Sequence, residues 1–194
     1  MHRVRTGILI SGRGTNMAAL IEAAKAPDYP AEIVLVISNS EGAGGLAVAE
    51  NKGIKALTIR HRDFATREAF EAELDIALTG SGVELICLAG FMRILSARFI
   101  QGWQGRLLNI HPSLLPQFRG LHTHEQALVA GVTTHGCTVH HVVPELDAGP
   151  IIAQASVRVL GGDTADSLAT RVLAEEIKLY PRALAIIAKS LSAL

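Results

Sequence analysis

The sequence lacks the features that direct a protein to nucleic acid, to a membrane or out of the cell. Its 18 lysines and arginines balance 18 aspartates and glutamates, so no positive excess drives non-specific binding to nucleic acid or anionic lipid. The first apolar run stops at Ser11 and Gly12, far short of a signal-peptide core or a membrane span. We therefore expect a cytoplasmic protein with no nucleic-acid partner and no membrane attachment.

Cysteine is also scarce. Cys87 and Cys137 give neither a disulfide framework nor the spacing of metal ligands, which fits a reducing compartment. Five histidines form no ligand set with cysteine or paired carboxylates, and structural hydrogen bonding is the simpler interpretation for them: His122, His124, His135, His140 and His141. The sequence therefore predicts no metal.

Aromatic residues make up only 4% of the 194 residues, whereas 49% are hydrophobic. These are mainly alanine, leucine, isoleucine and valine, a composition that favours helices packed on aliphatic strands, and the length suits one domain covering residues 1–194. Seven aliphatic runs are typical of strands: Val4 to Ile10, Ile33 to Ile37, Ala56 to Ile59, Leu85 to Ala89, Leu107 to Ile110, Val139 to Val143 and Ile151 to Val159.

Helical spacing of apolar residues appears between the expected strands and after the last one. The expected helices are Met17 to Ala26, Gly44 to Asn51, Phe64 to Leu78, Gln126 to Val129, and Thr164 to about Leu191. This alternation predicts a Rossmann-like α/β fold with a mostly parallel, seven-stranded twisted sheet and helices on both faces. In such folds ligands bind at the carboxyl ends of the strands.

A glycine-bearing loop, Ser11-Gly12-Arg13-Gly14-Thr15-Asn16, joins the first expected strand to the first helix. Backbone N–H groups and the helix dipole favour an anion there, and Thr15 and Asn16 could cap the helix or bind phosphate oxygens. A tight turn explains the loop equally well. The dinucleotide fingerprint is absent because Met17 replaces its third glycine, and no P-loop lysine follows. One phosphate of a small substrate fits better.

Asn109 and His111 lie two residues apart at the end of an expected strand, so their side chains leave the same face. Pro112 ends the strand pairing after them. Asp147, in a loop between two later strands, could reach His111 and favour its charged form, while the Asn109 amide adds a hydrogen-bond donor. An oxyanion-stabilising centre and a buried structural network both fit these residues.

Four motifs occur together along the chain: SGRGTN at 11–16, AGFMRIL at 89–95, NIHPSLLP at 109–116 and ELDAGPI at 145–151. Together they resemble the phosphoribosylglycinamide formyltransferase family, folate-dependent enzymes of purine synthesis, from about residue 4 to Pro181. The resemblance implies the formyltransferase fold and favours the catalytic interpretation of Asn109, His111 and Asp147. It also implies 10-formyltetrahydrofolate as the formyl donor and glycinamide ribonucleotide as the acceptor.

By this resemblance, Gly14, Thr15 and Asn16 hold the phosphate of the ribonucleotide, and Glu176 binds its ribose hydroxyls. The N-terminal half, to about residue 104, then binds the phosphate and the C-terminal half carries the catalytic residues. The implied folate-binding residues, several of which would otherwise be assigned to the core, are Met92, Arg93, Ile94, Leu95, Asn109 and Val142. Arg13 departs from the family pattern and receives no role.

The resemblance implies direct attack of the substrate amine on the formyl carbon, with the oxyanion facing Asn109 and protonated His111. Ser113 and Cys137 lack the setting of an activated nucleophile. The alternatives are a formyltetrahydrofolate hydrolase, which would carry an extra N-terminal regulatory domain, a methionyl-tRNA formyltransferase, which would carry an RNA-binding domain, and a non-catalytic nucleotide-binding module. Monomer and homodimer both fit the sequence.

Overall fold

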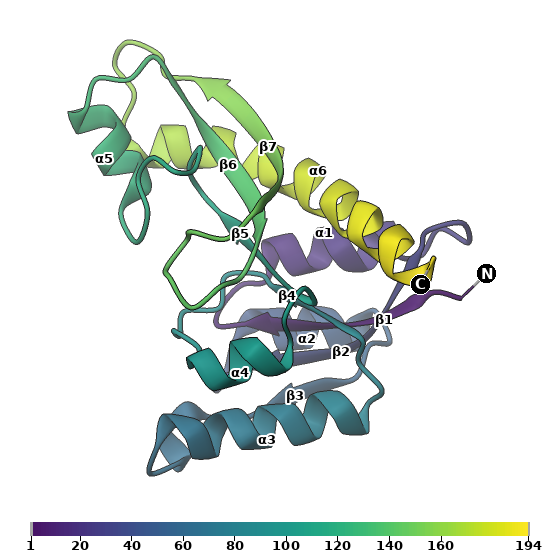
Figure 1. The fold of residues 1–194 in the computed structure, drawn as a ribbon. Helices are drawn as coiled ribbons and strands as arrows, with labels where there is room; N and C mark the ends of the chain where they lie inside the picture. The colour runs from purple at the N-terminus through teal and green to yellow at the C-terminus, as the bar shows by residue number, and fades with distance from the viewer. Residues whose placement is uncertain (1, 194) are drawn as a thin grey trace.

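A seven-stranded sheet forms the centre of the protein in the computed structural model, which describes residues 2–193 (Figure 1). The strand order is β3-β2-β1-β4-β5-β6-β7; the first five strands in this order are parallel, and β6 and β7 are antiparallel to their neighbours. The strands are β1 (Val4–Ile10), β2 (Ala31–Ser38), β3 (Ala56–Thr58), β4 (Leu85–Leu88), β5 (Leu107–His111), β6 (Thr134–His141) and β7 (Ile151–Arg158).

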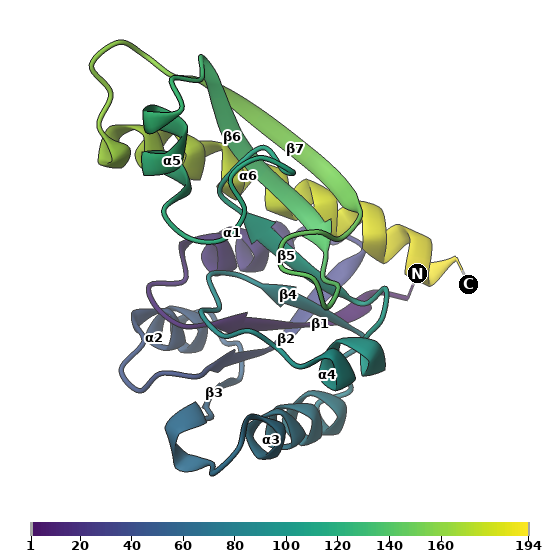
Figure 2. The same cartoon turned by 60° about the vertical axis from the view of Figure 1, so that its left-hand side comes forward.

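Helices cover both faces of this sheet (Figures 1 and 2). One buried apolar layer contains residues of α1, α2, α5 and α6, and the other contains residues of α3 and α4. The helices are α1 (Thr15–Ala23), α2 (Gly44–Asn51), α3 (Arg67–Gly80), α4 (Ala97–Gly102), α5 (Thr123–Val129) and α6 (Ala165–Ser192), with a short 3-10 helix, η1 (His61–Asp63). The predicted α/β class, with a mostly parallel sheet and helices on both faces, is confirmed.

The central strands owe their burial to side chains that alternate between these two layers. In β1, Ile8 and Ile10 belong to the layer of α1 and α6, whereas Leu9 between them belongs to the layer of α3 and α4. Successive side chains of a strand point to opposite faces, and a strand covered on both faces reads as a continuous apolar run. This is why β1 could be placed from the sequence.

The largest differences from the sequence prediction are in β6 and α4, whereas the bounds of the other α-helices and strands shift by at most three residues. β6 begins at Thr134, five residues before the predicted start at Val139, because its first residues pair with β7 although their sequence, Thr-His-Gly, lacks an apolar pattern. The helix α4 was not predicted at all. Its six residues are too few to show helical periodicity, and it begins where the Ser96 hydroxyl accepts a hydrogen bond from the Phe99 N–H.

The carboxyl edge of the parallel strands brings three loops together. The chain leaves β1 towards β2 and returns through β4 on the other side, so the topology switches between β1 and β4. At this point the Ser11 N–H donates to the Gly90 carbonyl at 3.2 Å, and the Ser11 hydroxyl accepts from the Met92 N–H at 2.8 Å and donates to Asn39 at 2.6 Å. Among residues 2–193, no helix is long and apolar enough to cross a membrane.

Candidate functional site

Three predicted site residues meet at the end of β5. Asn109 and His111 lie on this strand, and Asp147 comes from the β6–β7 loop with a positive φ of 49°. The Asp147 Oδ2 atom lies 3.4 Å from His111 Nδ1, and the two side chains are only 7% and 6% exposed. The structure therefore joins the imidazole and the carboxylate that the sequence placed 36 residues apart.

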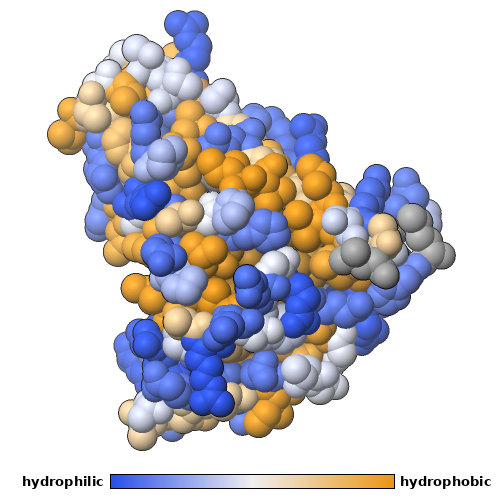
Figure 3. Space-filling model, viewed as in Figure 1, coloured by the Kyte–Doolittle hydropathy of each residue, from blue (hydrophilic) through white to orange (hydrophobic). Residues whose placement is uncertain are grey.

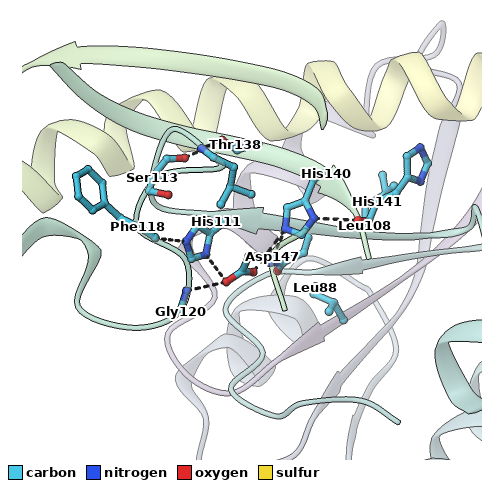
Figure 4. A network of polar contacts seen from close by, with 12 residues as sticks. Leu88, Leu108, His111, Ser113, Phe118, Gly120, Thr138, His140, His141 and Asp147 are labelled. Carbon is cyan, nitrogen blue, oxygen red and sulfur yellow. Dashed lines mark hydrogen bonds and ion pairs between the residues drawn. The ribbon is translucent and has the colours of Figure 1, made fainter. Parts of the chain in front are cut away.

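Backbone groups of the loop that follows β5 hold both partners of this pair (Figure 4). The His111 Nε2 atom lies 2.9 Å from the Phe118 carbonyl, and the Gly120 N–H donates to Asp147 Oδ2 at 2.9 Å. Each ring nitrogen of His111 thus faces an acceptor, a carboxylate at Nδ1 and a carbonyl at Nε2. Phe118 has a φ of 54°, so its carbonyl direction depends on a left-handed backbone that a non-glycine residue rarely adopts.

A fourth side chain, His140, lies within the site, although the sequence favours a purely structural hydrogen-bonding role for it. Asn109 and His140 are directly opposite in the antiparallel pairing of β5 with β6. The Asn109 Nδ2 atom lies 3.3 Å from His140 Nε2, which is also 3.7 Å from Asp147 Oδ1. Burial lowers the pKa of His140, against raising contributions from the His141 carbonyl and Asp147. Only the strand register brings His140 here.

These polar side chains line a cavity of about 550 Å³, within the size range of small-molecule sites. The loop after β4 and the β6–β7 loop form much of its wall. Every folate-binding residue proposed from the sequence lines this cavity: Met92, Arg93, Ile94, Leu95, Asn109 and Val142. Their position is consistent with ligand binding, while their individual roles stay predictions.

The mouth of the cavity exposes several large apolar side chains. Met92 is 67% and Ile94 66% exposed, so neither is the core residue that its type would suggest, whereas Leu95 is buried. Leu121 and Leu146 are also exposed and line the same cavity. Figure 3 shows apolar surface in the middle of the molecule, where the β6–β7 loop lies in Figure 1. Exposed apolar side chains gathered at a cavity are typical of a ligand-binding surface.

The glycine loop stands at the N-terminus of α1. Gly14 is the helix N-cap with a φ of 73°, and no side chain caps the helix, so the capping role considered for Thr15 and Asn16 is wrong. The Asn16 Nδ2 group instead donates to Glu176 Oε2 of α6 at 2.7 Å. Burial raises the pKa of Glu176, and the buried Asn16 Oδ1 atom has no hydrogen-bond partner. The structure thus brings together the proposed phosphate-binding and ribose-binding residues.

Comparison with known proteins identifies the family to which this arrangement belongs. The family model described as formyl transferase matches residues 4–184. The chain therefore belongs to the formyl transferase family. It is 46% identical over 174 residues to phosphoribosylglycinamide formyltransferase of Escherichia coli (strain K12), covering 90% of this chain and 82% of that protein.

Other formyl transferase relatives agree in sequence and structure. The crystal structure of phosphoribosylglycinamide formyltransferase from Brucella melitensis has 56% sequence identity and a TM-score of 0.92, covering 96% of each chain. Trifunctional purine biosynthetic protein adenosine-3 of Drosophila pseudoobscura pseudoobscura is 52% identical over 188 residues. That alignment covers 96% of this chain, which spans only 14% of the length of the trifunctional protein.

The two candidate nucleophiles of this family member are in unreactive settings. Burial raises the pKa of the Cys137 thiol to about 12, and the buried Ser113 hydroxyl donates to the Gln117 carbonyl at 2.6 Å. A reactive cysteine needs a lowered pKa, and a reactive serine needs an adjacent base. Among the described residues, no group of three or more histidine, cysteine, aspartate or glutamate side chains could hold a metal ion.

Proposed function

We propose that this protein transfers the formyl group of 10-formyltetrahydrofolate to the amine of N1-(5-phospho-D-ribosyl)glycinamide. The products would be the formylated ribonucleotide and tetrahydrofolate, in purine biosynthesis. The convergence of Asn109, His111 and Asp147 on the wall of an apolar cavity is the observation that carries this proposal. The names of the full-length relatives support the choice of acceptor.

The acceptor would bind across the glycine loop and α6. Its phosphate would lie on Gly14, Thr15 and Asn16, where a left-handed glycine at the start of α1 directs backbone N–H groups towards an anion. Its ribose hydroxyls would bind Glu176, whose carboxylate already accepts a hydrogen bond from Asn16.

The formyl donor would occupy the apolar cavity. Met92, Ile94, Leu95 and Val142 would contact its rings, and Arg93, which is exposed at the mouth, would meet its anionic tail. An apolar cavity with a few polar groups at one end is the usual form of a site for an aromatic ligand. The formyl group would then lie at the polar end, against Asn109.

In the proposed reaction the amine attacks the formyl carbon and forms a tetrahedral intermediate. Asn109 and His111 would donate hydrogen bonds to its oxyanion, and Asp147 would orient the imidazole and stabilise its positive charge. His111 Nε2 now contacts the Phe118 carbonyl, so donation from this nitrogen requires the ring to exchange that acceptor for the intermediate. Asp147 would also pass a proton, through water, from the attacking nitrogen to the leaving folate nitrogen.

Incubating the purified protein with 10-formyltetrahydrofolate, with and without glycinamide ribonucleotide, tests this proposal. Release of tetrahydrofolate is followed spectrophotometrically, and formylation of the acceptor is checked by mass spectrometry. We expect turnover only when the acceptor is present. Turnover without acceptor would instead show a hydrolase, and absence of turnover in both conditions would show a binding module.

A further inference from the structure

His140 meets the catalytic amide from the opposite strand and is buried at 2% exposure. Its two ring nitrogens make different contacts. Nδ1 lies 2.9 Å from the His141 carbonyl oxygen, and Nε2 lies 3.3 Å from the Asn109 amide nitrogen. Figure 4 shows the His140 ring beside Asp147, while the His141 ring points away from the site.

The contact with the His141 carbonyl fixes the tautomer of His140. A carbonyl oxygen only accepts hydrogen bonds, so Nδ1 must carry the hydrogen. In a neutral ring Nε2 is then an acceptor, and the atom of Asn109 that faces it must be a donor. The side-chain amide of Asn109 therefore directs its nitrogen, and not its oxygen, towards His140.

Burial lowers the pKa of His140 and so favours this neutral form of the ring. Asp147 in the β6–β7 loop and the carbonyl of the adjacent His141 raise this pKa, whereas His111 on β5 and the His141 ring lower it. A protonated ring would present an N–H at Nε2 to the Asn109 amide nitrogen. Two donors would then face each other across 3.3 Å.

An amide nitrogen has two hydrogens, and His140 uses only one of them. The second hydrogen of Asn109 is available to the cavity, where the proposed function places the formyl oxygen. A flipped amide would place its oxygen on the nitrogen's side and repel a developing oxyanion. We propose that His140 is a positioning residue that holds the Asn109 amide with its nitrogen towards the formyl oxygen.

This inference rests on the proposed function, and three substitutions at position 140 test it. His140→Leu removes both ring nitrogens. His140→Asn keeps a polar atom near the position of Nδ1 but leaves none near Nε2, whereas His140→Gln places an amide oxygen near the position of Nε2. We expect kcat to fall at least ~10-fold in the first two variants, below the roughly 10²- to 10³-fold cost of losing an oxyanion donor outright. KM for the acceptor should stay within about threefold because the acceptor-binding residues lie elsewhere.

His140→Gln should recover kcat to within about fivefold of wild type because it restores the hydrogen-bond acceptor. The matched control is His141→Gln on the same strand, since this ring does not line the cavity and should leave kcat unchanged. Thermal melting of every variant separates a loss of folding from a loss of positioning. Equal kcat losses in His140→Leu and His140→Gln, with unchanged melting, would overturn the inference.

Two further measurements separate positioning from general packing. In an Asn109→Ala background, His140→Leu should cost less than about twofold in kcat, because coupled residues are non-additive. Long-range ¹H–¹⁵N NMR should show a hydrogen on Nδ1 and none on Nε2 of His140. A full additional loss in the double variant, or a hydrogen on Nε2, contradicts the inference. Absence of formyl transfer in the wild-type protein would refute the proposed function, while the NMR tautomer would still test the contact itself.

Discussion

Replacing Asp147 with asparagine removes one negative charge from the centre of the site while hardly changing the size of the side chain. The carboxylate lies 3.4 Å from the His111 ring, and both side chains are more than nine-tenths buried. At an effective dielectric constant of about 20, two unit charges at this separation attract by roughly 4–5 kcal/mol. In the Asp147→Asn variant, the positive charge that the His111 imidazole carries in the proposed transition state would lose this attraction.

Asparagine still offers an oxygen to accept the Gly120 N–H, which offsets part of the loss. We therefore expect Asp147→Asn to lower kcat by roughly 10²- to 10³-fold, or about 3–4 kcal/mol of transition-state stabilisation. KM for the acceptor should change little. Steady-state release of tetrahydrofolate, at saturating concentrations of both substrates, measures this effect.

Glu145 provides the matched control for Asp147. It lies two residues earlier in the same loop, its side chain is exposed, and it does not line the cavity. Glu145→Gln removes the same formal charge and should leave kcat within about twofold, because exposed charges contribute little. If kcat of Asp147→Asn stayed within tenfold of wild type, the electrostatic role of Asp147 would be wrong.

Three further predictions concern stability and substrate binding. Gly14→Ala should lower the free energy of unfolding by at least ~1–2 kcal/mol in urea titrations, because Gly14 has a φ of 73° and a Cβ there would lie 3.0 Å from Gly45 Cα. The same substitution should raise KM for the acceptor, and unchanged stability and KM would contradict this prediction. Tyr180→Phe should lower the free energy of unfolding by ~1–3 kcal/mol in the same titrations, since the buried hydroxyl lies 3.0 and 3.2 Å from carbonyl oxygens of β4 and β5. A decrease below about 0.5 kcal/mol would show that these hydrogen bonds do not stabilise the fold. Burial and the neighbouring His124 lower the pKa of His135 from 6.5 to about 4. The unfolded chain therefore protonates this histidine more readily than the folded protein does, and the wild-type protein loses stability as the pH falls from 6.5 to about 4. His135→Gln should flatten that decline, and identical pH dependence in both proteins would refute the assignment.

The order of elements could be read from the sequence wherever the pattern is local. The bounds of β1 and α2 agree with the prediction, because a continuous apolar run and a helical spacing are properties of neighbouring residues. The paired orientation of Asn109 and His111 follows from the same period of two along a strand. Their chemistry and the motifs around them were also sufficient to indicate the family.

The contacts between distant segments were decided only by the tertiary structure. His140 enters the site because β6 pairs antiparallel with β5 in a register that sets it opposite Asn109, and a shift of one residue would turn the His140 ring to the other face. Asn16 meets Glu176 because α6 packs beside α1, although 160 residues separate them. Single-sequence patterns carry no information on register or on helix docking, since both depend on how whole layers pack. The sequence by itself therefore determined the elements and the chemically active residue types, and packing determined which of those residues act together.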